Sequence, residues 1–413
     1  MTESVRNHPF RDLIAAKGSV VIDGAMSTAL ESLGCNLNDS LWSAKILAED
    51  PEKIYEVHRR YYEAGADVAI TASYQASEAG FKAKGIGAEK AAELIALSVT
   101  LARRARDTVL AAHPEKRNSP LLVAGSVGPY GAYLADGSEY TGNYTLTRDE
   151  YRAFHGLRLK ALAEAGADLL AIETQPKPEE AAVVAQMAEE DGLSAWVTFS
   201  LADAEHTADG TPVTDAVRHL SAFDNIDALG FNCIRQEWAA RALELAHSVT
   251  DKPLIVYPNS GETYDPATKT WHHPVNHPGW DDFVGRWKSL GARCIGGCCR
   301  TLPADIVQST DAGVSAGSVS VKAALSLLWE GTAFQRLRRL YAVCSFDRSR
   351  FDRTLLRSKG GGAKRSCNAQ GGHRQLTQHR RSPPSLRACS PAGKRNTGYR
   401  RLSGKGQHAQ TNR

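Results

Sequence analysis

Short apolar runs recur along the first part of the chain, and each ends in small or polar residues. A stretch with helical spacing follows each run, so strands are expected to alternate with helices and to pair in parallel. Eight such units in about 300 residues predict an α/β fold, a (β/α)8 TIM barrel. The predicted strands are Val20–Asp23, Asp67–Ser73, Leu121–Val127, Asp168–Thr174, Ala195–Ser200, Ala228–Cys233, Leu254–Pro258 and Arg293–Gly297.

The stretches between the runs support this alternation. Residues 51–64 place Ile54, Val57 and Tyr61 on one helical face, and residues 148–165 show the same spacing. Glu-Ala-Gly-Ala-Asp precedes both the second and the fourth predicted strand, and its Gly suits the left-handed turn that ends a helix. A dinucleotide-binding open sheet would carry Gly-x-Gly-x-x-Gly after the first strand, whereas Asp-Gly-Ala-Met-Ser stands there.

Charge divides the chain into an acidic body and a basic tail. Residues 346–413 hold 17 Lys+Arg against 2 Asp+Glu, a charge of +15, which leaves −11 for residues 1–345 from the formal total of +4. We predict a barrel domain over residues 1–310, an uncertain helical segment over 311–345, and a basic low-complexity tail over 346–413 that is disordered. The tail is interpreted as inert or as a non-native read-through sequence, in preference to a nucleic-acid contact. Its departure from the barrel pattern raises the question whether the eighth strand closes on the first.

Composition restricts the cellular setting. The chain opens without a charged segment followed by an apolar one, and no run approaches the roughly 20 apolar residues of a membrane helix. We therefore expect a cytoplasmic protein without a membrane partner, as a monomer or weak oligomer. Eight cysteines in 413 residues do not form the disulfide framework of a small secreted domain, so metal binding or catalysis is the better use for them. Cys35 and Cys294 are expected to be structural, and no role is assigned to Cys344, Cys367 or Cys389.

Three cysteines lie at the ends of two predicted strands. Cys233 ends the sixth strand, and Cys298 and Cys299 follow the eighth. A TIM barrel gathers the carboxyl ends of all its strands on one rim, so these thiols are expected to be neighbours. Three thiolates form a zinc site with one position open, and Gly296–Gly297 allow the turn by which adjacent cysteines share one metal. The alternative for Cys233 alone is a small buried hydrophobe.

Seven short motifs occupy the predicted strand ends in a regular order. They are Asp23–Met26, Thr71–Ser77, Gly125–Gly131, Glu173–Thr174, Gly230–Cys233, Tyr257–Glu262 and Gly296–Arg300. With these motifs the chain resembles the cobalamin-independent homocysteine S-methyltransferases, zinc-dependent barrel enzymes that methylate homocysteine to methionine. Residues 130–144 resemble the branch that takes its methyl group from S-methylmethionine or S-adenosylmethionine rather than from betaine.

The resemblance implies a small-molecule methyl transfer that depends on Zn²⁺. Cys233, Cys298 and Cys299 would be both the metal ligands and the catalytic centre, with homocysteine at the open position. A free thiol is only a few per cent thiolate at neutral pH, and a metal-bound thiol is deprotonated. The bound thiolate would attack the methyl group of a sulfonium donor, a reaction that depends on positioning more than on acid or base catalysis.

Two predicted strand ends carry carboxylates. Asp23 and Glu173 end the first and fourth strands, where paired negative charge suits an α-ammonium group. The family resemblance assigns these positions to the amino group of homocysteine. The alternatives are a helix cap for Asp23 and a local salt bridge for Glu173.

Backbone groups are expected to bind the substrate carboxylate. N–H groups near Gly24 and Ala25, or in the stretch Ser73, Tyr74 and Gln75, lie where the chain is predicted to enter helices. Asn232 is predicted to orient the loop that carries Cys233, or to contact substrate.

A sulfonium donor needs aromatic faces and carboxylates rather than a phosphate cradle. Tyr74, Tyr130 and Tyr133 are candidates for the faces, with Trp42 as a more remote one; the alternative is that they are ordinary loop anchors. The histidine-rich residues 271–277 are interpreted as a solvated lid loop, because Pro274 breaks any helix that would pair their imidazoles on a metal.

Two other functions stay open. One is a related barrel thiol methyltransferase with another donor or acceptor. The other, from a different class, is a non-catalytic zinc-binding or nucleic-acid-binding protein that uses the barrel as a scaffold and the tail as a contact.

Overall fold

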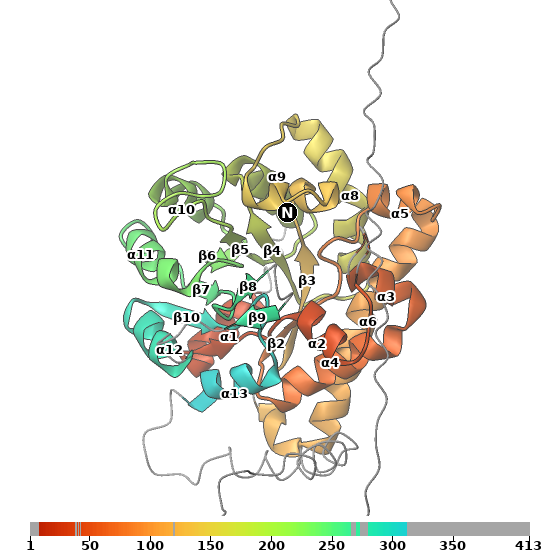
Figure 1. The fold of residues 1–413 in the computed structure, drawn as a ribbon, viewed down its shortest axis with the longest axis horizontal. Coiled ribbons are helices and arrows are strands. Elements are labelled where there is room, and N and C mark those ends of the chain that lie inside the picture. Colours follow the sequence, from red (N-terminus) through yellow and green to blue (C-terminus); the bar gives the residue numbers. More distant parts are fainter. Residues whose placement is uncertain are drawn as a thin grey trace, which may run out of the picture. The chain divides into compact units, whose positions relative to one another are not determined.

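The computed structural model describes residues 8–311, apart from 38, 40, 42, 119, 266–269 and 273–279. Eight parallel strands form a barrel in the middle of this region, and helices surround it (Figure 1). The barrel strands are β1 (Val20–Val21), β2 (Val68–Ile70), β3 (Leu122–Val127), β4 (Leu169–Gln175), β5 (Ala195–Phe199), β6 (Ile226–Asn232), β7 (Leu254–Tyr257) and β10 (Ala292–Ile295). All eight predicted strands are therefore confirmed, and so is the (β/α)8 class.

The barrel closes through its shortest strand, β1. Val20 pairs with Cys294 and Val21 with Ile295 on one side, and Ile22 forms a parallel bridge with Val68 of β2 on the other. The remaining strands follow in the order β10-β7-β6-β5-β4-β3-β2. The eighth barrel strand thus meets the first within the described residues, which answers the question that the atypical tail raised.

The helices follow the predicted alternation. The two helices expected over residues 51–64 and 148–165 are present as α4 (Pro51–Glu63) and α8 (Arg148–Glu164). The helices are α1 (Pro9–Lys17), α2 (Met26–Ser32), α3 (Ser43–Glu49), α4 (Pro51–Glu63), α5 (Glu78–Ala83), α6 (Ala88–Ala112), α7 (Tyr130–Leu134), α8 (Arg148–Glu164), α9 (Pro178–Glu190), α10 (Val213–Ser221), α11 (Gln236–His247), α12 (Trp280–Ser289) and α13 (Pro303–Asp311), with two 3-10 turns, η1 (Pro114–Asn118) and η2 (Ser138–Tyr140).

Local sequence signals explain where two of these helices begin and end. Thr147 and Glu150 form a reciprocal capping box at the start of α8, which satisfies two backbone N–H groups. The repeated Gly of Glu-Ala-Gly-Ala-Asp is left-handed in both copies, with φ of 103° at Gly65 and 80° at Gly166. Each copy therefore ends a helix and starts the turn into the next strand, as its sequence predicted.

Helix α1 precedes the first strand and was not predicted. It closes the amino end of the barrel, where Phe10, Leu13 and Ile14 are buried in the interior core. The ring of Phe10 lies 5.0 Å from that of Trp196 on β5. The spacing of these three apolar positions suits one face of a helix, and that face replaces solvent at the open end of the barrel.

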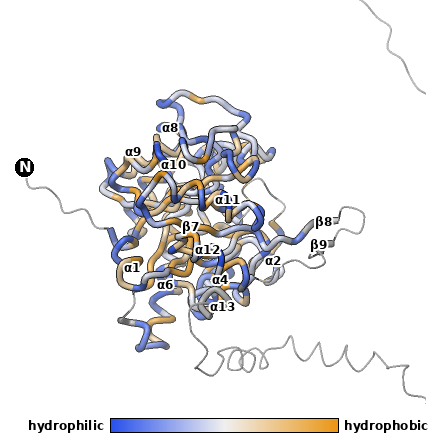
Figure 2. The backbone as a smooth tube through the Cα atoms, turned by 90° about the vertical axis from the view of Figure 1, so that its left-hand side faces the viewer, coloured by the Kyte–Doolittle hydropathy of each residue, from blue (hydrophilic) through white to orange (hydrophobic). Residues whose placement is uncertain are grey.

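A two-stranded hairpin follows β7, where a solvated loop was predicted. β8 (Thr263–Asp265) pairs antiparallel with β9 (Thr270–His272), so His272 belongs to a strand; His273 and His277 lie outside the described residues. The prediction missed the hairpin because its strands are three residues long, too short for a periodic signal. In Figure 2 the hairpin and α1 lie at opposite ends of the barrel, and the apolar stretches gather between them.

Among the described residues, no helix has the length and apolarity to cross a membrane. The predicted helical segment over 311–345 and the predicted disordered tail over 346–413 lie outside the described residues, except for the last residue of α13.

Candidate active site at the carboxyl ends of the strands

The barrel interior changes from apolar to polar toward the carboxyl ends of its strands. Alternate residues of a strand face the same side, so each inward side chain recurs two residues later. Apolar residues such as Ala124, Ala171 and Ile255 fill the lower interior, and two residues further along each strand the inward side chain is polar. The buried polar layer consists of Ser126, Glu173, Thr198, Asn232 and Tyr257.

Above this layer, the structure brings the three predicted thiols together. The Sγ atoms of Cys233, Cys298 and Cys299 all lie within 4.8 Å of one another. The Sγ atoms of Cys233 and Cys299 are 3.4 Å apart. Among the described residues this is the one cluster of three or more potential metal ligands that comes so close together. Its geometry matches a site in which three sulfur ligands face one ion.

Backbone hydrogen bonds fix the position of each thiol. The N–H of Cys233 donates to Tyr257 O (3.2 Å), and the N–H of Cys298 donates to Pro258 O (2.7 Å). The N–H of Cys299 donates to Asn259 Oδ1 (3.1 Å). The end of β7 therefore holds both cysteine segments.

The two glycines before Cys298 follow the end of β10, where the prediction required the strand to have ended, and they also allow close packing. Neither has a positive φ, so they do not supply a left-handed turn. A Cβ on Gly297 would come within 2.4 Å of the Thr301 side chain, and one on Gly296 within 2.7 Å of Ile22 Cβ. They allow close packing between the end of β10 and its surroundings. Cys233 (φ 54°) and Arg300 (φ 69°) instead have the left-handed backbone conformation, which residues other than glycine seldom adopt.

Contacts among the sulfur atoms shift the pKa values of the thiols in different directions. Hydrogen bonding with Cys233 and Cys299 raises the pKa of Cys298, whereas hydrogen bonding with Cys233 and Cys298 lowers the pKa of Cys299. The cluster can therefore share a negative charge among its sulfur atoms, and a cation placed between them would favour further deprotonation.

Glu173 lies buried below the thiols in a network of hydroxyl groups. Its Oε1 accepts a hydrogen bond from Ser126 Oγ, and its Oε2 accepts one from Tyr257 OH (3.2 Å). Burial raises the pKa of Glu173 to about 7, against the lowering effect of these two hydrogen bonds. No Lys, Arg or His of the described chain forms a salt bridge with it, so the alternative of a local salt bridge is contradicted within that region.

Asp23 is the second buried carboxylate at this end of the barrel. Its Oδ2 accepts a hydrogen bond from the N–H of Ile70 (2.9 Å). Burial raises the pKa of Asp23 well above its usual value, and the charge of Glu173 raises it further. Helix α2 starts after Ala25 without a side-chain cap, which contradicts the alternative that Asp23 caps a helix. The two carboxylates thus lie within electrostatic reach of each other, and neither has a cationic partner within the described residues.

The remaining predicted binding residues take different places. The space at Gly24 is filled by Tyr61 OH, 2.8 Å from where a Cβ would lie, and the N–H of Ala25 donates to Thr301 Oγ1 (3.1 Å). That N–H is therefore already occupied. Ser73 Oγ donates to Ser126 O (2.8 Å), which ties the end of β2 to the polar layer.

The sequence suggested that a helix starts around Tyr74, but no helix starts there. Helix α5 begins only at Glu78, where Ser77 caps it. Gln75 Nε2 donates to Ala132 O (3.0 Å) and so holds α7 in place. The phenol of Tyr74 hydrogen-bonds to the Thr174 side chain, and burial raises its pKa, as does the charge of Glu139. Of this stretch, Tyr74 is the residue whose side chain belongs to the site.

Asn232 anchors the end of β4. Its Oδ1 accepts from the N–H of Thr174 (2.8 Å) and from Thr198 Oγ1 (2.8 Å), while its Nδ2 donates to Thr174 Oγ1 (2.8 Å). Thr174 has a φ of 57°, an outlier for a β-branched residue. Asn232 therefore stabilises the strained residue next to Glu173, and it precedes Cys233 in the chain.

The aromatic candidates divide into two groups. Tyr130 and Tyr133 pack on each other (5.5 Å between ring centroids) and on Phe154 of α8 (5.0 and 5.6 Å), as the loop-anchor alternative expected. Tyr74 lies at the site, and Trp42 is outside the described residues.

Four residues of the site were not predicted to belong to it. Tyr140 OH lies 3.0 Å from Cys233 Sγ, although Tyr140 is 93 residues away in the chain. Ser126 and Tyr257 hold Glu173, and Asn259 holds Cys299. Ser126, Tyr257 and Asn259 belong to motifs at strand ends, so strand alternation could have indicated the first two. Tyr140 lies within residues 130–144, and the resemblance of that segment to the sulfonium-using branch was the one sequence signal that could have indicated it.

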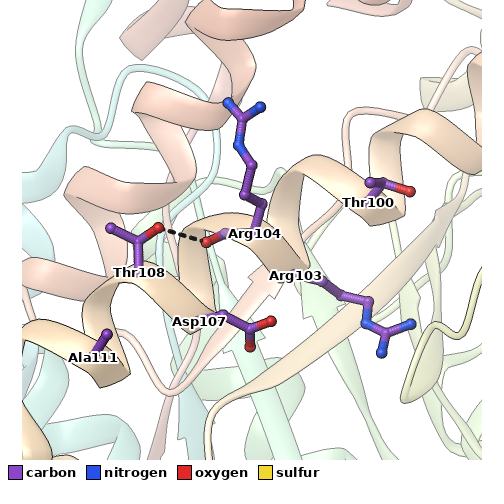
Figure 3. A pocket seen from close by; sticks show the side chains of 6 residues that line it. All are labelled: Thr100, Arg103, Arg104, Asp107, Thr108 and Ala111. Atoms are coloured by element: carbon purple, nitrogen blue, oxygen red, sulfur yellow. Dashed lines mark hydrogen bonds between the residues drawn. The ribbon is translucent and has the colours of Figure 1, made fainter.

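A separate hollow of about 520 Å³ lies on the outside of α6 (Figure 3). Thr100, Arg103, Arg104, Asp107, Thr108 and Ala111 line it. Arg104 pairs with Glu52 (2.6 Å) and stacks over the ring of Tyr55 (3.9 Å), so its guanidinium is already engaged. No predicted site residue lies there.

Comparison with known proteins gives a consistent result. A profile described as homocysteine S-methyltransferase matches residues 20–312. Homocysteine S-methyltransferase of Escherichia coli K12 is 52% identical over 303 residues, which cover 73% of this chain and 97% of that protein. Homocysteine S-methyltransferase YbgG of Bacillus subtilis 168 is 49% identical over 301 residues, 72% of this chain and 96% of that protein.

Solved structures agree with the sequence comparison. The metallated form of the homocysteine methyltransferase MmuM from Escherichia coli superposes with a TM-score of 0.66 at 49% identity, covering 73% of this chain and 99% of that one. Its oxidized form gives a TM-score of 0.67 at 49% identity, covering 74% and 99%.

Proposed function

This chain belongs to the homocysteine S-methyltransferase family, and we propose that it transfers a methyl group from a sulfonium donor to the thiol of homocysteine, which yields methionine. The observation that carries the proposal is the cluster of three thiols above two buried carboxylates that have no basic partner among the residues that the structure describes. The cluster suits a metal and a sulfur substrate, and the carboxylates suit an ammonium group. An α-amino thiol such as homocysteine presents both.

The donor set indicates which metal the cluster holds. Three sulfur atoms are soft ligands, and they suit Zn²⁺ better than the oxygen-seeking Mg²⁺ or Ca²⁺. Cys233, Cys298 and Cys299 would hold the ion and leave the fourth position to the substrate sulfur. When bound, Zn²⁺ keeps the substrate thiol deprotonated at neutral pH, where thiols are otherwise mostly protonated.

Asp23 and Glu173 orient homocysteine in this proposal. Its α-ammonium group would lie between the two carboxylates, both of which are buried, and the charge of Glu173 acts on Asp23. A cation at this point removes their mutual repulsion, so it lowers the pKa of both acids. Ser126 and Tyr257 keep Glu173 in place through hydroxyl hydrogen bonds. The substrate is thus anchored at one end while its sulfur faces the cysteines.

The chemical step exchanges one carbon–sulfur bond for another. A lone pair of the homocysteine thiolate forms a bond to the donor methyl carbon. The bond between that carbon and the sulfonium sulfur breaks, and its electron pair stays on the departing thioether. One negative and one positive charge disappear together. Since no proton moves at the reacting carbon, the residues of the site act mainly by positioning the reactants.

The test is to measure metal content and methionine formation on the same preparation. The protein should carry one Zn²⁺ per chain and form methionine from homocysteine with S-methylmethionine or S-adenosylmethionine. Competition between the two donors would identify the preferred one. Protein with bound zinc that forms no methionine from either donor would contradict the proposal, and folded protein that takes up no zinc would contradict the metal assignment.

A further inference from the structure

Glu139 belongs to the 3-10 turn η2, which two contacts hold against the site. Ser200 Oγ, at the end of β5, donates to the carbonyl oxygen of Glu139 (2.6 Å). The next residue, Tyr140, places its hydroxyl 3.0 Å from Cys233 Sγ. Glu139 is therefore fixed between a barrel strand and the thiol cluster, although it belongs to a connection between α7 and α8.

The carboxylate of Glu139 lies near this cluster, and its Oε2 is buried. Burial is the main cause of the raised pKa of Tyr74, and the charge of Glu139 raises it further; at Cys299 the same charge opposes the larger hydrogen-bond effects that lower the pKa. The charge of Cys233 in turn raises the pKa of Glu139, after the larger effect of burial. These reciprocal effects place the carboxylate within electrostatic reach of both the thiols and the Tyr74 phenol.

Glu139 has no counter-charge within the described part of the chain. Its Oε2 is buried and has no hydrogen-bond partner there, and no Lys, Arg or His of that part pairs with it. A buried carboxylate without a partner costs free energy, so such groups are normally paired with a cation. The proposed function, on which this inference rests, supplies a cationic substrate.

We propose that Glu139 is the counter-charge for the sulfonium group of the methyl donor, and that it determines preference for a cationic donor. For methyl transfer, the donor carbon must approach the attacking sulfur to roughly 3–3.5 Å, so the sulfonium must lie beside the thiol cluster. Glu139 and Cys233 both act electrostatically on Tyr74, and the hydroxyl of Tyr140 lies 3.0 Å from Cys233 Sγ, so a carboxylate and two aromatic side chains lie near the cluster. Aromatic faces and a carboxylate are the groups that recognise an onium cation.

The reaction predicts a particular kinetic signature for such a residue. The sulfonium charge is full in the bound donor and partly lost in the transition state. A nearby carboxylate therefore stabilises the bound donor more than the transition state, so it lowers the donor KM without raising kcat. A residue that only shaped the loop would alter kcat, the homocysteine KM or metal binding as well.

The experiment measures both substrates separately in the Glu139→Gln variant. The donor KM, with S-methylmethionine, should rise about tenfold, as expected for the loss of one charge contact. The homocysteine KM and zinc content should stay at the wild-type values, and kcat should be equal or higher. Glu139→Asp keeps the charge on a shorter side chain, so its donor KM should lie between those of wild type and Glu139→Gln.

Asp136→Asn is the matched control. It removes the same charge three residues earlier, from an exposed side chain whose Oδ1 accepts from the N–H of Ser138 (3.0 Å), a bond that Asn can keep. Asp136 also exerts its charge on Glu139, but water and salt screen an exposed charge, so Asp136→Asn should change the donor KM much less than Glu139→Gln does.

A donor KM that is unchanged in Glu139→Gln would overturn the inference, as would a fall in kcat with an unchanged donor KM. Either result leaves the proposed function intact if the wild type forms methionine. Absence of methionine from the wild type would instead reject the proposed function before Glu139 is considered.

Discussion

Two pairs of buried acids, one pair at each end of the barrel, differ in their counter-charges. At the amino end, Asp67 pairs with Lys17, and Asp227 pairs with His8 (2.7 Å) and Arg11 (3.0 Å). At the carboxyl end, Asp23 and Glu173 have hydroxyl and amide partners but no cation within the described chain. The first arrangement compensates charge inside the protein, and the second leaves that compensation to a ligand.

The backbone shows the same contrast. Of the four non-glycine residues with a positive φ in the described chain, three lie at the carboxyl ends of barrel strands: Thr174, Cys233 and Arg300. Such conformations cost free energy and persist where the surrounding structure enforces them. The amino end is instead closed by the apolar face of α1. One end of the barrel is therefore organised for stability and the other for binding, the division expected of TIM barrels.

The largest expected effect comes from a comparison of two cysteines in one segment. One belongs to the thiol cluster, and the other lies in the buried core. Cys298→Ala should lose both zinc and measurable methyl transfer, because two thiolates are left for the ion. Cys294→Ala lies four residues earlier, inside the buried core. It should keep one zinc per chain and full turnover while lowering the free energy of unfolding by about 1 kcal/mol. Full activity of Cys298→Ala, measured with its zinc content, would refute the assignment of the cluster.

A smaller effect on activity, seen in the homocysteine KM, is expected at Glu173. Glu173→Gln removes one of two carboxylates from the proposed ammonium site, so the homocysteine KM should rise roughly 100-fold while zinc content is kept. Steady-state kinetics with each substrate varied in turn would measure it. An unchanged homocysteine KM would remove Glu173 from the ammonium site.

Although Glu173→Gln should weaken homocysteine binding, it should increase the free energy of unfolding at alkaline pH. The pKa of Glu173 is about 7 in the folded protein against 4.5 for an ordinary Glu, so the folded state binds the proton more tightly. Its contribution to stability is therefore present below pH 4.5 and is lost as the pH rises through 7. At pH 8, metal-free Glu173→Gln should exceed the wild type by up to roughly 3 kcal/mol, and below pH 4.5 the difference should vanish. Urea unfolding at both pH values would measure this, and equal stability at pH 8 would contradict it.

The smallest effect on turnover is expected at the amino end. Phe10→Ala removes the ring that packs on Trp196, so the free energy of unfolding should fall by about 3 kcal/mol. Below the unfolding transition, kcat and both KM values should match the wild type. A change in the donor or homocysteine KM would show that the two ends are less independent than their charge and packing indicate.

Much of the fold could be predicted because it depends on local periodicity. All eight barrel strands, and the glycine turns before two of them, follow from patterns within each segment. Helix α1 was missed because it precedes the repeating pattern of strands and helices. Its apolar face is buried only through contact with the closed barrel. The β8–β9 hairpin was missed because it is too short to be periodic.

The site was predictable where it coincides with strand ends. Cys233, Cys298 and Glu173 end strands, and a barrel brings all such positions to one rim. Glu139 and Tyr140 lie in a turn between two helices, and contacts with Ser200 and Cys233 determine where that turn lies. Those contacts join residues 61 and 93 positions apart, so the spacing of residues does not indicate them. The resemblance of residues 130–144 to one branch of the family pointed to this segment but assigned no role to the two side chains.

The pairing of Val20 with Cys294 has a consequence for synthesis of the chain on the ribosome. The first strand is made early, yet its partner on one side emerges some 270 residues later. The same late segment carries Cys298 and Cys299, so the last strand completes the wall and the metal-binding cluster in one event. A nascent chain cannot present three clustered thiols before its barrel is closed. Metal uptake should therefore report that the barrel is closed, and available metal should favour the chains that have reached this stage.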